Sequence, residues 1–124
     1  MNKEQTITGV IRGTGACVPE RILDNKEIAG FVDTSDEWIR ERTGVRRRRI
    51  AEKETTVSMA CEAGRQAVEE AGISSDEIDM ILVATGSPDQ IFPCTACQVQ
   101  EALGADGASA AELKEIDFYQ NISP

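Results

Sequence analysis

The chain has 124 residues, a net charge of −9 and 40% hydrophobic residues. This length corresponds to one domain at most, and the acidic balance argues against nucleic acid or an anionic membrane surface as a partner. No apolar run is long enough to cross a bilayer and no apolar signal stretch opens the chain, so we expect a cytoplasmic protein. The chain has no histidine, which excludes Cys-His and Ser-His nucleophilic pairs within it.

The first elements expected along the chain are a strand and a short helix. Residues 6–12 are rich in β-branched side chains and predict a strand. The Gly-Thr-Gly of residues 13–15 predicts an irregular connection and is a weak signal for phosphate binding, because the full dinucleotide fingerprint is missing. A helix is expected to begin near Asp24, with Glu27 as its capping-box partner.

A second helix is expected to begin at Thr34, which would cap it, with Glu37 three residues later. It should stop at Gly44. Six arginines follow its start within ten residues: Arg40, Arg42, Arg46, Arg47, Arg48 and Arg49. Such a cluster suits a phosphate-bearing ligand or an acidic protein, and it equally suits a solvated loop with charges at a helix end.

The second half of the chain predicts helix, strand and helix. Residues 56–71 carry small apolar side chains at helical spacing, which suits close packing on a neighbouring sheet or helix. Residues 79–85 form a continuous apolar run, typical of a parallel strand covered on both faces. Residues 93–103 predict a further helix. The order indicates an α/β fold, and a sheet with only two strands indicates part of a larger sheet.

Four cysteines, at positions 17, 61, 94 and 97, are expected to be free thiols. Cys94 and Cys97 form a Cys-x-x-Cys, for which a redox site, half of a zinc site and ordinary packing are all possible readings. A single pair cannot fill four zinc positions, so no metal site is predicted. Cys61 lies on the apolar stripe of residues 56–71 and is expected in the core.

One segment is far more specific than the glycines. Asp33-Thr-Ser-Asp-Glu-Trp-Ile39, followed by Arg42-Thr-Gly-Val-Arg46, closely resembles a signature of the β-ketoacyl-acyl-carrier-protein synthase III family. Segments matching that family extend over about residues 7–109. The resemblance implies a thiolase-like α/β/α/β/α fold, of which residues 1–110 would be a partial N-terminal domain with an incomplete sheet and residues 111–124 a divergent tail.

The resemblance also implies a function. The family condenses an acyl-coenzyme A, such as acetyl-CoA, with malonyl-acyl-carrier protein to start fatty acid synthesis, and it acts as a homodimer. A cysteine carries the acyl group as a thioester, and a histidine and an asparagine stabilise the developing charge. Coenzyme A is thus expected as a substrate, acyl-carrier protein as a partner, and no covalently bound cofactor.

The resemblance assigns four residues to the nucleotide end of coenzyme A. Trp38 stands where the family stacks adenine, although the bare sequence favours a half-buried tryptophan that anchors a helix. Arg42 would meet phosphate or a ring face, and Thr34 and Thr43 could donate hydrogen bonds nearby. Residues 46–49 would extend the positive rim toward coenzyme A or the carrier protein.

Phe92 matches a position that reaches across the dimer axis toward the partner's acyl pocket in the family. An ordinary core phenylalanine is the alternative, and the two readings stay open.

The match fails from Ala111 onward. Asp117 then occupies the position of the nucleophilic cysteine, and Asn121 lies far from the spacing of the catalytic asparagine. No catalytic residue is therefore assigned, and truncation, a frameshift or an incomplete reading would each explain the tail. The sequence predicts an enzyme fragment that is inactive alone. A non-catalytic fragment binding coenzyme A, carrier protein or synthase subunits, and a small acidic redox protein, are the alternatives.

Overall fold

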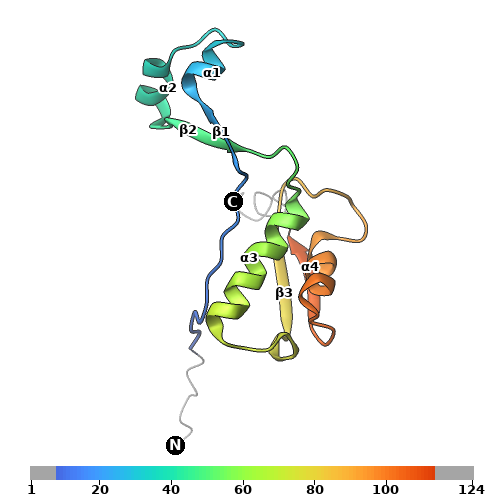
Figure 1. Cartoon of the computed structure of the whole chain (residues 1–124). Helices are drawn as coiled ribbons and strands as arrows, with labels where there is room; N and C mark the ends of the chain where they lie inside the picture. The colour runs from blue at the N-terminus through green and yellow to red at the C-terminus, as the bar shows by residue number, and fades with distance from the viewer. Residues whose placement is uncertain (1–7, 114–124) are drawn as a thin grey trace, which may run out of the picture.

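The computed structural model describes residues 8–113, which form two groups of elements (Figure 1). The first group is an antiparallel hairpin with two short helices, and the second is a parallel strand pair with two longer helices. The chain is α/β with an incomplete sheet, as the sequence predicts. None of the described helices is both long and apolar enough to cross a membrane.

The hairpin of the first group joins β1 (Arg21–Asp24) to β2 (Arg47–Ile50), with Leu23 opposite Arg48. Helices α1 (Asn25–Ala29) and α2 (Asp36–Thr43) lie between the two strands in sequence. The sequence does not predict this hairpin. Its second strand is the arginine-rich run. Part of the segment whose polar composition indicates a solvated loop is therefore a strand.

The caps of these two helices differ from the prediction in part. Asp24 accepts a hydrogen bond from the Glu27 amide at 2.8 Å, as predicted, but the Glu27 carboxylate pairs with Arg21 at 2.6 Å instead of completing a capping box. Helix α2 is capped by Ser35 and not by Thr34. Ser35 has the extended backbone of an N-cap and accepts the Trp38 amide at 3.1 Å, so the prediction was wrong by one residue.

The second group contains α3 (Thr56–Ala71), the 3₁₀ turn η1 (Ser75–Glu77), β3 (Met80–Ala84), α4 (Thr95–Leu103) and β4 (Ser109–Leu113). Strands β3 and β4 pair in parallel, with Leu82 opposite Ala111. The predicted ends of α2, α3 and α4 are confirmed, since each stops at a glycine with positive φ: Gly44, Gly72 and Gly104. Strand β4 crosses the boundary expected after residue 110.

The core of the second group is built around α4. Val99 on this helix is buried with Ala96, and Ala105 and Ala108 after it are buried too. Helix α3 lies against α4, where Gly64 leaves room for the Leu103 side chain. This contact confirms that the small-residue stripe packs closely on a neighbour. Cys61 on the same stripe is only half-buried.

Strand β3 is covered on one face only within residues 8–113. Ile81 and Val83 are half-buried, whereas Met80 and Leu82 keep 62% and 56% of their surface exposed. The expectation of a strand covered on both faces is therefore wrong for the described part. Because the run is apolar throughout, the exposed face of β3 carries the apolar side chains that are typical of a buried strand face.

The strand predicted over residues 6–12 does not form in the part that the structure describes. Residues 8–12 form no strand, and residues 6 and 7 lie outside the described range. The chain instead runs along α3, where Gly13 and Gly15 approach the backbone of Ala67 and Ala63 so closely that a Cβ would collide. Thr14 binds the Glu70 carboxylate through its amide and, at 2.8 Å, through its hydroxyl. The two glycines serve close packing, and the nearest polar partner is an anion, which opposes phosphate binding here.

Candidate functional site

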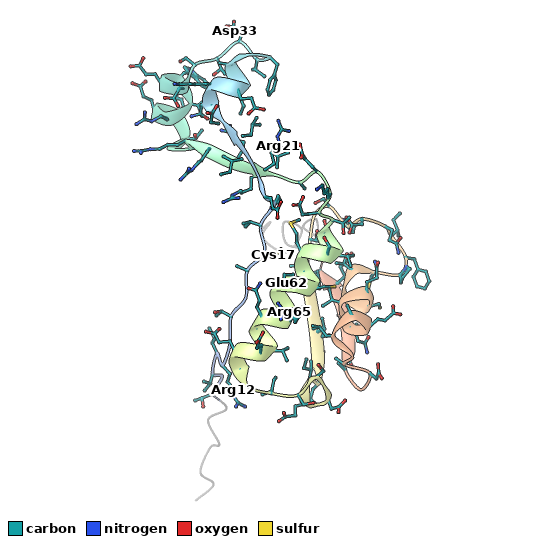
Figure 2. All side chains as sticks on the ribbon, in the orientation of Figure 1. Arg12, Cys17, Arg21, Asp33, Glu62 and Arg65 are labelled. Carbon is teal, nitrogen blue, oxygen red and sulfur yellow. The ribbon has the colours of Figure 1, made fainter. Side chains whose placement is uncertain are left out.

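The candidate site lies on α2, at the end of the hairpin group that carries Asp33 (Figure 2). Trp38 and Arg42 are four residues apart and therefore share one face of the helix. The guanidinium carbon of Arg42 lies 5.6 Å from the centre of the Trp38 ring, within the range of a cation–π contact. Trp38 is 54% exposed, so the indole keeps a large open surface beside a positive charge.

A hollow of about 310 Å³ borders this ring. It is lined by Asp33, Thr34, Ser35 and Trp38, and thus by the segment that enters α2. The Thr34 hydroxyl oxygen is buried and has no hydrogen-bond partner among the described residues. Of the side chains at this hollow, the indole offers the aromatic surface on which a flat ring can stack.

Thr43 lies at the other end of α2, where it is exposed and bonds to the local backbone. Its hydroxyl donates to the Ile39 carbonyl at 2.7 Å and accepts the Val45 amide at 3.1 Å. These bonds secure the last turn of the helix. Among the four predicted site residues, Trp38 and Arg42 are thus the two that meet each other, while Thr34 and Thr43 have their hydroxyls turned to the protein.

A larger hollow of about 550 Å³ borders α2 on the residues Asp36, Glu37, Arg40, Glu41, Gly44 and Arg46. Three carboxylates line it against two guanidinium groups, and Arg40 is already paired with Asp36 at 3.4 Å. This charge balance makes it a poor place for phosphate. The smaller hollow is the better candidate for an adenine ring, because the Trp38 indole lines it.

Asn25 holds α2 in place from within the hairpin group. The side chain is 1% exposed. Its amide nitrogen donates to Asp36 at 2.8 Å and to the Val45 carbonyl at 2.9 Å, and its oxygen accepts from Arg48 at 3.0 Å. The bond from Asn25 is the main cause that lowers the pKa of the Asp36 carboxyl. One buried amide therefore connects α1, the start of α2, the loop after α2 and β2.

The sequence gives no local signal for this role of Asn25, because a polar residue after a helix cap usually faces water. The arginine cluster also divides by function. Arg48 serves the Asn25 network, and Arg49 donates to the Pro19 and Glu20 carbonyls at 3.2 and 3.0 Å. Arg46 and Arg47 are exposed. Arg49 is exposed as well, so three of the four predicted rim residues lie at the surface and Arg48 is half-buried.

The remaining predicted residues lie away from α2. Phe92 is 88% exposed, so it is not a core phenylalanine of the described part. The thiols of Cys94 and Cys97 lie 3.3 Å apart, and all four cysteines are free. No group of three or more metal-binding side chains occurs within residues 8–113. Asp117 and Asn121 lie outside those residues.

No protein-family model matches the chain. Curated relatives do match: the β-ketoacyl-[acyl-carrier-protein] synthase III of Erythrobacter litoralis is 49% identical over 111 residues, 89% of this chain and 35% of the relative. A Bacillus anthracis protein named β-ketoacyl-[acyl-carrier-protein] synthase III 1 is 52% identical over 104 residues, 83% of this chain and 34% of the relative. The chain thus spans about a third of the length of the curated relatives it matches.

Solved structures agree with the sequence match. The 3-oxoacyl-[acyl-carrier-protein] synthase III of Aquifex aeolicus superposes with a TM-score of 0.82 at 41% identity, over 90% of this chain and 39% of that one. The synthase III of Thermus thermophilus gives 0.78 at 39% identity, over 86% and 33%. The resemblance drawn from residues 33–46 is confirmed, and the thiolase-like fold class with it.

Proposed function

Because the chain is related to part of the β-ketoacyl-acyl-carrier-protein synthase III family, we propose that it carries the coenzyme A nucleotide subsite of such a condensing enzyme. The contact between Trp38 and Arg42 is the observation that carries this proposal. An exposed indole with a guanidinium beside it combines stacking surface for adenine with positive charge for phosphate, at little cost in side-chain entropy.

In this proposal Trp38 stacks the adenine ring and Arg42 meets a phosphate or the ring face. Thr34 and Thr43 flank the two contact residues. To bind the ligand, the Thr34 hydroxyl has to leave its buried position and the Thr43 hydroxyl has to give up its bond to the Ile39 carbonyl. Stacking of a base on an aromatic side chain contributes about 1–3 kcal/mol. With one added ion pair, this chain alone would bind coenzyme A with a Kd on the order of 1 mM.

The whole enzyme would join an acyl-coenzyme A, such as acetyl-CoA, to malonyl-acyl-carrier protein, as a homodimer in the fatty acid pathway. The 124 residues contain no histidine, and the family uses a cysteine, a histidine and an asparagine for this condensation. We therefore propose that this chain binds the nucleotide end of the substrate but does not form a carbon–carbon bond unaided.

The binding is tested with Trp38, the single tryptophan of the chain. Its fluorescence is titrated with coenzyme A, with adenosine 3′,5′-bisphosphate and with pantetheine. Saturable quenching by the first two ligands and none by pantetheine is expected. A flat response to coenzyme A from a sample with intact helical circular dichroism contradicts the proposal.

The lack of condensation is tested separately with radiolabelled acetyl-CoA. No labelled thioester should survive precipitation of the protein. A stable labelled thioester on any of the four cysteines contradicts the inactive assignment without touching the binding result.

A second candidate is association with synthase subunits. Ile91 and Phe92 are 84% and 88% exposed, and Met80 and Leu82 leave one face of β3 open. Exposed apolar groups that adjoin one another are typical of protein contacts. Co-expression with a full-length synthase III, followed by affinity purification of one tagged partner, tests this role. Capture that survives high salt is expected, and separate elution at all concentrations contradicts it.

A further inference from the structure

Two thiols stand side by side where α4 begins. Cys94 is the N-cap residue, with the extended backbone angles φ −66° and ψ 158°, and Cys97 is the third residue of the helix. Side chains at these two positions face each other, which is why a capping side chain can reach the amide of the third residue. The Sγ atoms are 3.3 Å apart in the free thiol state.

Among residues 8–113, the surroundings leave this pair open to small molecules. Cys97 is exposed and Cys94 is half-buried. The Cys94 side chain makes no cap hydrogen bond, and the helix end is secured without it, because the Glu112 carboxylate accepts the Thr95 amide at 2.7 Å. A change at the Cys94 sulfur therefore does not remove the bond that holds the first turn.

The other two cysteines lack this arrangement. Cys17 and Cys61 are both half-buried, and partial burial raises the pKa of the Cys61 thiol. The pKa of Cys97 is raised too, but by the hydrogen bond shared with Cys94. A protonated thiol is a poor nucleophile, so exchange through the Cys97 sulfur should become faster as the pH rises.

We infer that Cys94 and Cys97 form a redox-active dithiol, which a small-molecule disulfide such as glutathione disulfide oxidises to an intramolecular disulfide. The inference is independent of the proposed coenzyme A subsite on α2. It assigns a modification site that the condensation reaction does not use.

The exchange proceeds in two steps. The thiolate of one cysteine attacks a sulfur of the small disulfide, whose S–S bond breaks and releases one small thiol. The thiolate of the second cysteine then attacks the protein sulfur of the mixed disulfide and releases the other small thiol. The protein loses two protons and two electrons, and the small disulfide takes them up and is reduced to two thiols. The sulfurs must close from 3.3 Å to about 2.0 Å to form the bond.

The test equilibrates the whole chain with glutathione buffers of graded oxidised-to-reduced ratio. Acid quenching, alkylation and peptide mass spectrometry then locate every disulfide. The 94–97 disulfide should be the main oxidised species. It should be half-formed at an oxidised-to-reduced ratio at least tenfold lower in native buffer than in concentrated urea, because the folded helix start holds the sulfurs together.

Two sets of variants serve as the control and as the loss-of-disulfide test. C17S/C61S should keep the disulfide and its midpoint unchanged. C94S and C97S should each lose it and accumulate a stable glutathione adduct on the remaining cysteine. Adducts on all four cysteines without a 94–97 bond, or equal midpoints in native buffer and urea, would overturn the inference.

Discussion

Arg42 lies over the ring of Trp38, with its guanidinium carbon 5.6 Å from the ring centre. The two residues are one helical turn apart on α2, whose end at Gly44 is fixed by a left-handed backbone, φ 72°. The charge is therefore held at the aromatic surface before any ligand arrives. A preformed contact of this kind lowers the ordering cost of binding.

Two variants of Arg42 distinguish the contribution of its positive charge from that of its planar guanidinium. Arg42→Ala should weaken coenzyme A binding about tenfold, since a charge-assisted contact is lost, and Arg42→Lys should fall between it and the parent chain because the planar surface is lost. Isothermal titration measures both. Arg40→Ala is the control, because Arg40 is paired with Asp36. Unchanged affinity in Arg42→Ala would remove Arg42 from the site.

Asn25→Ala should destabilise the chain by about 2–4 kcal/mol, because it leaves buried partners without hydrogen bonds. The side chain joins Asp36, Val45 and Arg48. Urea unfolding followed by Trp38 fluorescence measures the change. Lys26→Ala, on the exposed side of the same helix, should stay within about 0.5 kcal/mol of the parent. Equal midpoints for the two variants would show that the network adds no stability.

The Glu54 carboxylate accepts the amides of Glu20, Glu52 and Lys53, at 3.1 to 3.2 Å. The backbone hydrogen bond from its own amide, followed by those from Glu52, Glu20 and Lys53, lowers the pKa of Glu54 from 4.5 to about 2. The unfolded chain therefore takes up a proton at this residue first as the pH falls.

Stability from Glu54 should accordingly be complete above about pH 4.5 and disappear as the pH drops to about 2. Urea midpoints measured across that window should decline less in Glu54→Gln than in the parent chain. Glu101→Gln, on the surface of α4, is the control. Parallel pH profiles for Glu54→Gln and the parent would contradict the assignment.

Gly15→Ala should loosen the segment that runs along α3, because its Cβ would collide with the Ala63 backbone. Overpacking of this type costs about 1–3 kcal/mol. Gly9→Ala is the matched control on the same segment, since no atom of the described residues lies within 4 Å of its added Cβ. Hydrogen exchange of the α3 amides and thermal melts compare the two variants. Equal protection in both would mean that the segment does not pack as described.

Helices with a regular apolar stripe could be predicted from the sequence. The bounds of α3 (Thr56–Ala71) follow from helical spacing and from Gly72, and β3 (Met80–Ala84) follows from a continuous apolar run. These signals are local. For α3 and β3, the structure adds which elements they pack against or pair with.

Elements that depend on distant partners could not be predicted. Strand β4 (Ser109–Leu113) is made of Ser-Ala-Ala-Glu-Leu, which has weak strand propensity, and it forms because β3 offers its edge. Strand β2 (Arg47–Ile50) consists largely of arginine and pairs with β1 across two inserted helices. Tertiary pairing outweighs local composition in both strands.

The contact between Trp38 and Arg42 was predictable, because one helix supplies both residues. Trp38 and Arg42 are four residues apart, and helical geometry alone brings them together. The contribution of Asn25 was not predictable, because its burial depends on β2 and on the loop after α2. Thr34 shows a smaller failure: the neighbouring Ser35 satisfies the same capping rule.

The most direct test of the central claim is an NMR measurement of coenzyme A bound to the whole chain. Nuclear Overhauser effects are recorded between the adenine protons of coenzyme A and the indole protons of Trp38, the single tryptophan. The proposed subsite predicts intermolecular effects from the adenine protons to the indole ring and to the Arg42 side chain. Binding without any effect between adenine and Trp38, or with adenine contacts only to other residues, would contradict it.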